Sequence, residues 1–169
     1  MKLLMRLFIL SFFYSTFIVY AKADDKRVAE QPYMGYLFAY FEGTGDRALH
    51  EHIRFAVSED AVNWKALNHN YPIILSDSVS KSGGMRDPHI LRGEDGRSFY
   101  MVATDMNVAE YGWGANPGIV MMKSDDLIHW THAYIELAKV YPKNFGDAFW
   151  VWAPQTIYDP AARKYMVYF

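Results

Sequence analysis

The 169-residue chain has no cysteine, few charged residues and no apolar run long enough to cross a bilayer. Without cysteine there are no disulfides, no thiolate catalysis and no thiolate metal sites. Charged residues make up 21% of the chain and its net charge is −2, a balance that does not suggest disorder or a nucleic-acid partner. Gly43 and Gly45 are not followed by the Gly-Lys-Ser and helix of a phosphate-binding loop.

Aromatic residues, in contrast, are abundant. The chain contains 13 Tyr, 11 Phe and 5 Trp, and 51% of its residues are hydrophobic. Large planar side chains pack well in β-sheets and also serve as stacking platforms for ligands. The composition is therefore that of a globular protein with an aromatic-rich core or binding surface.

Residues 1–23 have the layout of a secretory signal peptide: a basic start, an apolar stretch and the small-x-small sequence Ala21-Lys22-Ala23. An anchoring helix is the alternative, but the uncharged run from Leu7 to Ala21 has 15 residues, whereas about 20 are needed to span a bilayer. We therefore expect cleavage after Ala23 and a secreted or periplasmic protein that is not held at the membrane.

The rest of the chain, residues 24–169, contains an internal repeat. FAVSEDAVNW from Phe55 recurs as MMKSDDLIHW from Met121, 66 residues later. A fixed period of this length indicates a solenoid, propeller or array, in which each unit buries a face only against its neighbours.

Within the repeat, short β-rich runs alternate with turn signals, and no long helical pattern is present. The predicted strands are Tyr36–Phe41, His52–Val57, His89–Leu91, Ser98–Thr104, Gly118–Lys123, Thr131–Leu137, Thr156–Tyr158 and Tyr165–Phe169. The Ser-acid-Asp turns that follow two of them are predicted to cap hairpins through Ser58, Asp60, Ser124 and Asp126, and Trp64 and Trp130 are predicted to cover the core. Four antiparallel strands repeated radially predict a β-propeller, with about two blades in this chain.

The two copies differ where the innermost strands begin. One begins Arg86-Asp87-Pro88-His89 and the other Trp152-Ala153-Pro154-Gln155, with the prolines 66 residues apart. Since proline is tolerated only at the first residue of a strand, at an edge or at a bulge, both prolines mark the mouth of the channel. We expect the side chains beside them to face the axis, where a propeller binds its ligand.

The order of these motifs resembles glycoside hydrolase family 43. The resemblance covers about residues 33–169 and rests on Asp-Pro-His-Ile, on Ser-Asp-Asp-Leu-Ile-His-Trp, and on Trp-Ala-Pro followed by Lys-Tyr-Met-Val-Tyr. It implies an all-β, five-bladed propeller of an inverting glycosidase that removes arabinose, xylose or galactose units from plant polysaccharides. It also implies three carboxylates: a base, an aspartate that tunes the acid, and a glutamate acid.

Carried over by position, the resemblance places Asp87 on the general base, which takes a proton from the attacking water. Taken alone, an Asp-Pro pair would indicate only a turn. Arg86 would hold this carboxylate ionised or bind a sugar hydroxyl. The other candidate substrate-binding residues are His89, Trp113, Trp152 and Gln155. His89 could instead be a core histidine, and Trp113 could be buried under its own loop.

The resemblance is incomplete at the other two carboxylates. Gln155 stands where many members carry aspartate, and it cannot supply negative charge. Asp105 and Asp147 are possible substitutes, each interpreted first as a strand-end or loop carboxylate. No glutamate lies in a context that resembles the acid, so we expect a fragment that lacks the acid and is inactive by itself.

Two function classes follow from these observations. The first is a secreted glycosidase with Asp87 as base, and the second is a propeller that binds carbohydrate without cutting it. The histidines show no metal-ligand spacing, and we expect no cofactor, apart from a possible structural calcium in the channel of a complete propeller. The expected partner is a polysaccharide or oligosaccharide, and the expected oligomeric state is a monomer.

Overall fold

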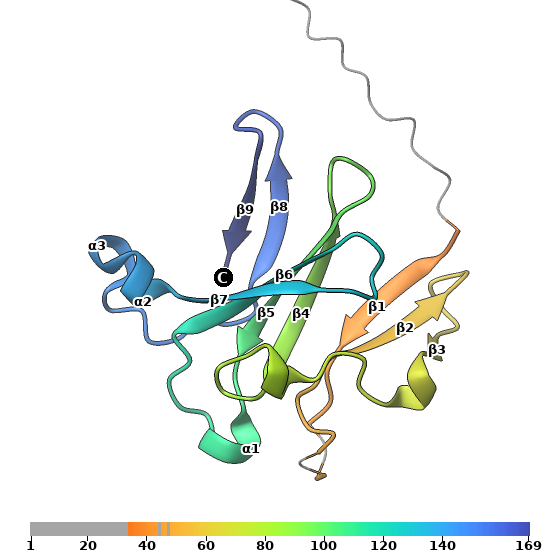
Figure 1. The fold of residues 1–169 in the computed structure, drawn as a ribbon, viewed down its shortest axis with the longest axis horizontal. Coiled ribbons are helices and arrows are strands. Elements are labelled where there is room, and N and C mark those ends of the chain that lie inside the picture. Colours follow the sequence, from red (N-terminus) through yellow and green to blue (C-terminus); the bar gives the residue numbers. More distant parts are fainter. Residues whose placement is uncertain (1–33, 44, 47) are drawn as a thin grey trace, which may run out of the picture.

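The computed structural model describes residues 34–43, 45–46 and 48–169, so the predicted signal peptide lies outside the described residues. Nine strands dominate, and the helical segments are short (Figure 1). The strands are β1 (Tyr36–Tyr40), β2 (Arg54–Ser58), β3 (Lys65–Ala66), β4 (Met85–Arg92), β5 (Phe99–Asp105), β6 (Gly118–Ser124), β7 (Thr131–Glu136), β8 (Gln155–Asp159) and β9 (Lys164–Tyr168). The helical segments are η1 (Asn68–Asn70), η2 (Ser76–Ser78), α1 (Val108–Tyr111), α2 (Leu137–Val140) and α3 (Pro142–Phe145).

The strands form three antiparallel sheets in chain order, β1-β2-β3, β4-β5-β6-β7 and β8-β9. The middle sheet is a complete four-stranded meander, as predicted for one blade. None of the helices in the described part of the chain is long and apolar enough to cross a membrane. The all-β class is therefore confirmed, and the arrangement is consistent with part of a propeller.

The sequence repeat is a repeat of strand pairing. Tyr36 pairs with Ser58 across β1 and β2, as Phe99 pairs with Ser124 across β5 and β6. Val57 pairs with Lys65, as Lys123 pairs with Thr131. The first sheet therefore repeats the last three strands of the middle sheet.

The Ser-acid-Asp turns cap their hairpins as predicted. Asp60 accepts hydrogen bonds from the backbone N–H groups of Val62 and Asn63, and Asp126 does the same in the second copy. Trp64 differs from the prediction: it is 42% exposed and packs on Phe38 at the open face of the first sheet, whereas Trp130 packs on Phe55 in the core. The difference arises because no described element covers the face on which Trp64 lies.

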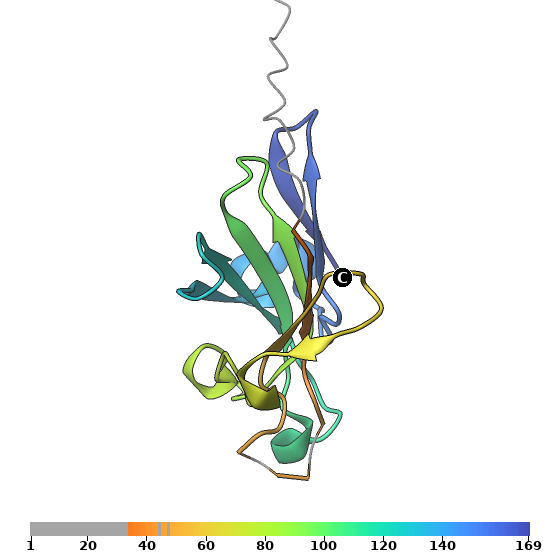
Figure 2. The ribbon, with the colours of Figure 1, turned by 90° about the vertical axis from the view of Figure 1, so that its right-hand side faces the viewer.

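Two hydrophobic cores lie between the three sheets. In Figure 1 strands β4 and β5 lie between the β8-β9 hairpin and β1-β2, and in the turned view of Figure 2 the sheets overlap. Alternate residues of β6 serve both: Val120 and Met122 face the first sheet, while Ile119 packs with Val151 on the other side. This alternation follows from the two-residue period of a strand. The middle sheet thus buries both of its faces, whereas each outer sheet buries the face that it turns toward the middle sheet, as expected of neighbouring units in a repeat architecture.

Candidate active site

The candidate site lies at the start of β4, where the structure adds detail to the predicted strand. β4 begins at Met85 rather than at His89, and Pro88 lies inside it at a bulge, between Arg86 and His89. A bulge leaves the proline nitrogen out of the ladder and re-aims the neighbouring side chain. The carboxylate of Asp87 is consequently exposed at the end of the sheet.

The backbone at the two strand starts is unusual in the same way. Asp87 has φ of 51° and Ala153 has φ of 47°, and each precedes a proline. Residues other than glycine adopt this left-handed conformation at a cost, and such residues concentrate at functional sites. The two chain segments thus carry the same local geometry with different side chains.

The hydroxyl of Thr104, on β5, joins these segments. Thr104 Oγ1 donates to Asp87 Oδ2 at 3.1 Å and accepts from the backbone N–H of Ala153 at 2.9 Å. Thr104 itself is completely buried. Nothing in the sequence motif marks this threonine, and only the alignment of β5 beside β4 places it there.

Arg86 was predicted to hold Asp87 ionised or to bind a sugar hydroxyl, and in the structure its guanidinium pairs with Glu51. Its Nη1 lies 3.4 Å from Glu51 Oε1, and its guanidinium is stacked between the rings of Phe41, at 4.8 Å, and Trp113, at 4.6 Å. Arg86 is therefore committed to protein contacts, and through them it fixes the position of Trp113.

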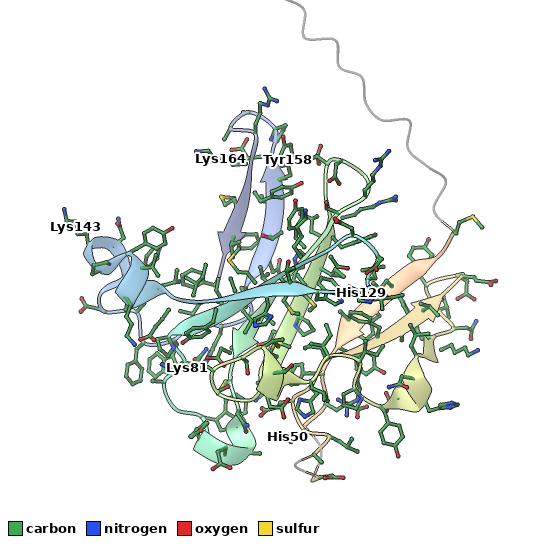
Figure 3. All side chains as sticks on the ribbon, viewed as in Figure 1. His50, Lys81, His129, Lys143, Tyr158 and Lys164 are labelled. Atoms are coloured by element: carbon green, nitrogen blue, oxygen red, sulfur yellow. The ribbon has the colours of Figure 1, made fainter. Side chains whose placement is uncertain are left out.

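Glu51 is a second residue that the sequence did not single out as part of the site. Its carboxylate is 1% exposed, accepts from the backbone N–H of Val108 at 2.8 Å and lies 3.1 Å from His50 Nε2. A buried carboxylate needs such partners to offset the loss of water. His50 and Lys81 are labelled in Figure 3, at the end of the sheets where β4 begins.

Aromatic rings line this end of the molecule. Trp113 is 67% exposed and Trp152 44% exposed, and their rings meet edge to face with centroids 6.5 Å apart. Trp150 continues the group, at 6.0 Å from Trp152. Exposed indoles offer flat apolar faces on which the C–H face of a sugar ring can stack.

His89 and Gln155 make contacts within the protein. His89 Nδ1 accepts the backbone N–H of Thr156 at 3.2 Å, and burial lowers the pKa of His89, so the ring is neutral near pH 7. Gln155 begins β8, is exposed, and its Oε1 accepts from the hydroxyl of Tyr168 at 2.6 Å. His89 thus ties β4 to β8, whereas the amide group of Gln155 stays accessible.

The two possible substitute carboxylates have different surroundings. Asp105 is buried at the end of β5, where it accepts the backbone N–H of Ser82 at 2.9 Å. Burial, with the negative charge of Asp105 as a second cause, raises the pKa of Tyr134 to about 12. Asp147 is exposed in the segment between α3 and β8. Asp105 therefore holds a loop in place, and it is not open to solvent as Asp87 is.

The all-β repeat thus brings an exposed acidic residue and exposed indoles together at one end, an arrangement suited to binding a carbohydrate. Residues 31–169 match the family described as "Probable glycosyl hydrolase domain", which is related to glycosyl hydrolase family 43, and the chain belongs to this family. The chain is also similar to an alpha-L-arabinofuranosidase of Bifidobacterium longum subsp. longum, with 26% identity over 151 residues. That match covers 86% of this chain and 14% of the relative. No solved structure matches the chain.

Proposed function

We propose that this chain contributes the base-bearing part of an exported glycoside hydrolase that cleaves arabinose, xylose or galactose linkages with inversion. Asp87 is the general base in this proposal, and residues 24–169 belong to a five-bladed propeller. The family membership supports the reaction class, and the name of the arabinofuranosidase relative makes arabinofuranosides the first substrates to test. Export follows from the signal peptide predicted for residues 1–23.

The observation that carries the proposal is the setting of Asp87. Its carboxylate is exposed, held by Thr104 and placed by a bulge at the start of β4, while Arg86, beside it in the chain, stacks on Trp113. A base that activates water must reach solvent and keep a fixed orientation. The aromatic rings at the same end of the molecule would hold the sugar.

The reaction takes a proton from a water molecule as it attacks the anomeric carbon on the face opposite the leaving group. The carboxylate of Asp87 accepts that proton. Gln155, at the equivalent start of β8, cannot act as an acid, but its amide can bind a sugar hydroxyl. We propose that the acid that protonates the leaving group comes from another blade.

A substrate that needs no acid tests the base directly. α-L-Arabinofuranosyl fluoride loses fluoride without protonation, so a chain that carries only the base should hydrolyse it. We expect release of the inverted sugar, detected by its anomeric proton signal, and a loss of about 100-fold or more in kcat for Asp87→Asn. Equal rates for wild type and Asp87→Asn would show that Asp87 is not the base.

A carbohydrate-binding propeller without catalysis is the second candidate, and Gln155 is the residue that favours it. This function predicts that arabino-oligosaccharides quench the fluorescence of the exposed tryptophans while the fluoride substrate is not turned over. Trp152→Ala should then weaken binding by about tenfold, the value of one stacking contact.

A further inference from the structure

The most defined link in the site is the hydroxyl of Thr104, which joins the starts of both inner strands. Its oxygen contacts Asp87 Oδ2 on β4 at 3.1 Å and the backbone N–H of Ala153, before β8, at 2.9 Å. The second contact bridges 49 positions of sequence, so the sequence offers no local signal for it.

The polarity of these two bonds is fixed by chemistry. A backbone N–H can only donate, so Thr104 Oγ1 must accept from Ala153. The one hydroxyl proton is then free to point at Asp87 Oδ2, and an ionised carboxylate can only accept it. The chain before β8 thus orients the hydroxyl, and the hydroxyl orients the carboxylate.

Burial makes this orientation stable. Thr104 has no exposed surface, so water cannot replace either partner. The β-branched side chain also has few χ1 rotamers in a strand, which keeps the hydroxyl where it is. Asp87 needs such support because it is exposed and its backbone is in a left-handed conformation.

We propose that Thr104 is the positioning residue for the Asp87 base and that it couples the base to the Trp152-Ala153-Pro154 segment of the next inner strand. The catalytic part of this inference rests on the proposed function of Asp87. In this arrangement Oδ2 is held by Thr104, and Oδ1 is left to take the proton from water. A sugar that stacks on Trp152 would contact the segment whose N–H holds the same hydroxyl.

Thr104→Val tests the inference, since it replaces the hydroxyl with a methyl group of similar size. We expect kcat on α-L-arabinofuranosyl fluoride to fall about 10- to 100-fold at unchanged KM, because a misplaced base lowers the rate without changing substrate contacts. Thr104→Ser should restore most of the rate. Thr156→Val is the matched control: Thr156 is also buried, and its hydroxyl donates to the Met166 carbonyl, away from the base.

A double variant separates positioning from general loss of structure. If Thr104 acts through Asp87, Thr104→Val should lower the rate no further in an Asp87→Asn background. A full-sized additional loss there would overturn the inference. If the Asp87→Asn variant keeps wild-type activity, the proposed base is refuted. If Asp87→Asn is inactive but Thr104→Val has the wild-type rate, only the positioning role of Thr104 is refuted.

Two measurements decide the geometry even if no substrate is turned over. At pH 7 the carboxylate carbon signal of Asp87 should move in Thr104→Val and return in Thr104→Ser. The amide of Ala153 should exchange faster in the valine variant, because its acceptor is lost. Unchanged signals and exchange in Thr104→Val would overturn the inference whatever the activity.

Discussion

Removing the guanidinium of Arg86 tests the charge network that supports the site. In Arg86→Ala, the carboxylate of Glu51, 1% exposed, loses the cation 3.4 Å away. The contacts with Phe41 and Trp113 are lost at the same time. The first change leaves the buried carboxylate of Glu51 with less compensation, and the second removes packing around Trp113.

The size of the effect follows from burial. Breaking a buried ion pair by removing one partner costs about 3–5 kcal/mol, and each cation–π contact contributes roughly 0.5–1 kcal/mol where it is partly exposed. The side chain of Arg86 is 18% exposed, and Glu51 keeps the Val108 N–H, so the low end applies. We expect Arg86→Ala to lower the free energy of unfolding by about 3 kcal/mol.

The loss of unfolding free energy is measured by urea unfolding followed by far-UV circular dichroism. Tryptophan fluorescence is unsuitable, because the signal of Trp113 would change when its contact with Arg86 is removed. Glu51→Gln in the Arg86→Ala background should recover at least about 1 kcal/mol, because a neutral amide needs no cation. Arg92→Ala, which removes an arginine whose Nε donates to the Gly96 carbonyl at the surface, is the control and should cost less than about 0.5 kcal/mol. The reasoning would be refuted if Arg86→Ala lowered the free energy of unfolding by less than about 1 kcal/mol, or if the effects of Arg86→Ala and Glu51→Gln on that free energy were strictly additive.

Three further outcomes are expected. Met101 is 1% exposed in the core, so Met101→Ala should lower the free energy of unfolding in urea by about 2–5 kcal/mol. The control Met34→Ala, at a position 91% exposed, should lower it by less than about 0.5 kcal/mol, and similar losses for the two variants would contradict the assigned core. Hydrogen bonds from its own turn lower the pKa of Asp95 from 3.8 to about 2. The wild type should therefore be more stable than Asp95→Ala above pH 3.8, and this difference should vanish as the pH falls towards 2. A difference that persists below pH 2 would show that ionised Asp95 is not its source. Trp113→Ala should weaken arabino-oligosaccharide binding about tenfold in a titration, and unchanged affinity would remove Trp113 from the binding surface.

The all-β class and the strand order could be predicted because their determinants are local and repeated. Short β-rich runs between turn signals place the strands, and the Ser-acid-Asp turns fix each hairpin through bonds between residues two or three positions apart. The 66-residue period then gives the order of the sheets. Each of these signals lies within one short window of sequence.

The support of the site could not be predicted, because its contacts are not local. Glu51 meets Arg86 only when the loop before β2 packs on the start of β4. An isolated Glu-His pair carries no pattern that would mark it as buried. The sequence motif therefore gives no sign that Arg86 pairs with Glu51 rather than with the adjacent Asp87, whose side chain points to the opposite face of the strand.

The equivalence of Asp87 and Ala153 connects the repeat to the chemistry. Both residues precede a proline, both have a left-handed backbone, and both bond the same hydroxyl, one through a carboxylate and the other through its N–H. The backbone geometry at a strand start is therefore a property of the repeat, and the side chain placed on it sets the function of that copy. With aspartate, the position offers the carboxylate that we propose as the base; with alanine, it leaves an N–H that orients the hydroxyl beside that carboxylate. A repeat that keeps its backbone while exchanging one side chain can in this way divide the proposed site between neighbouring sheets.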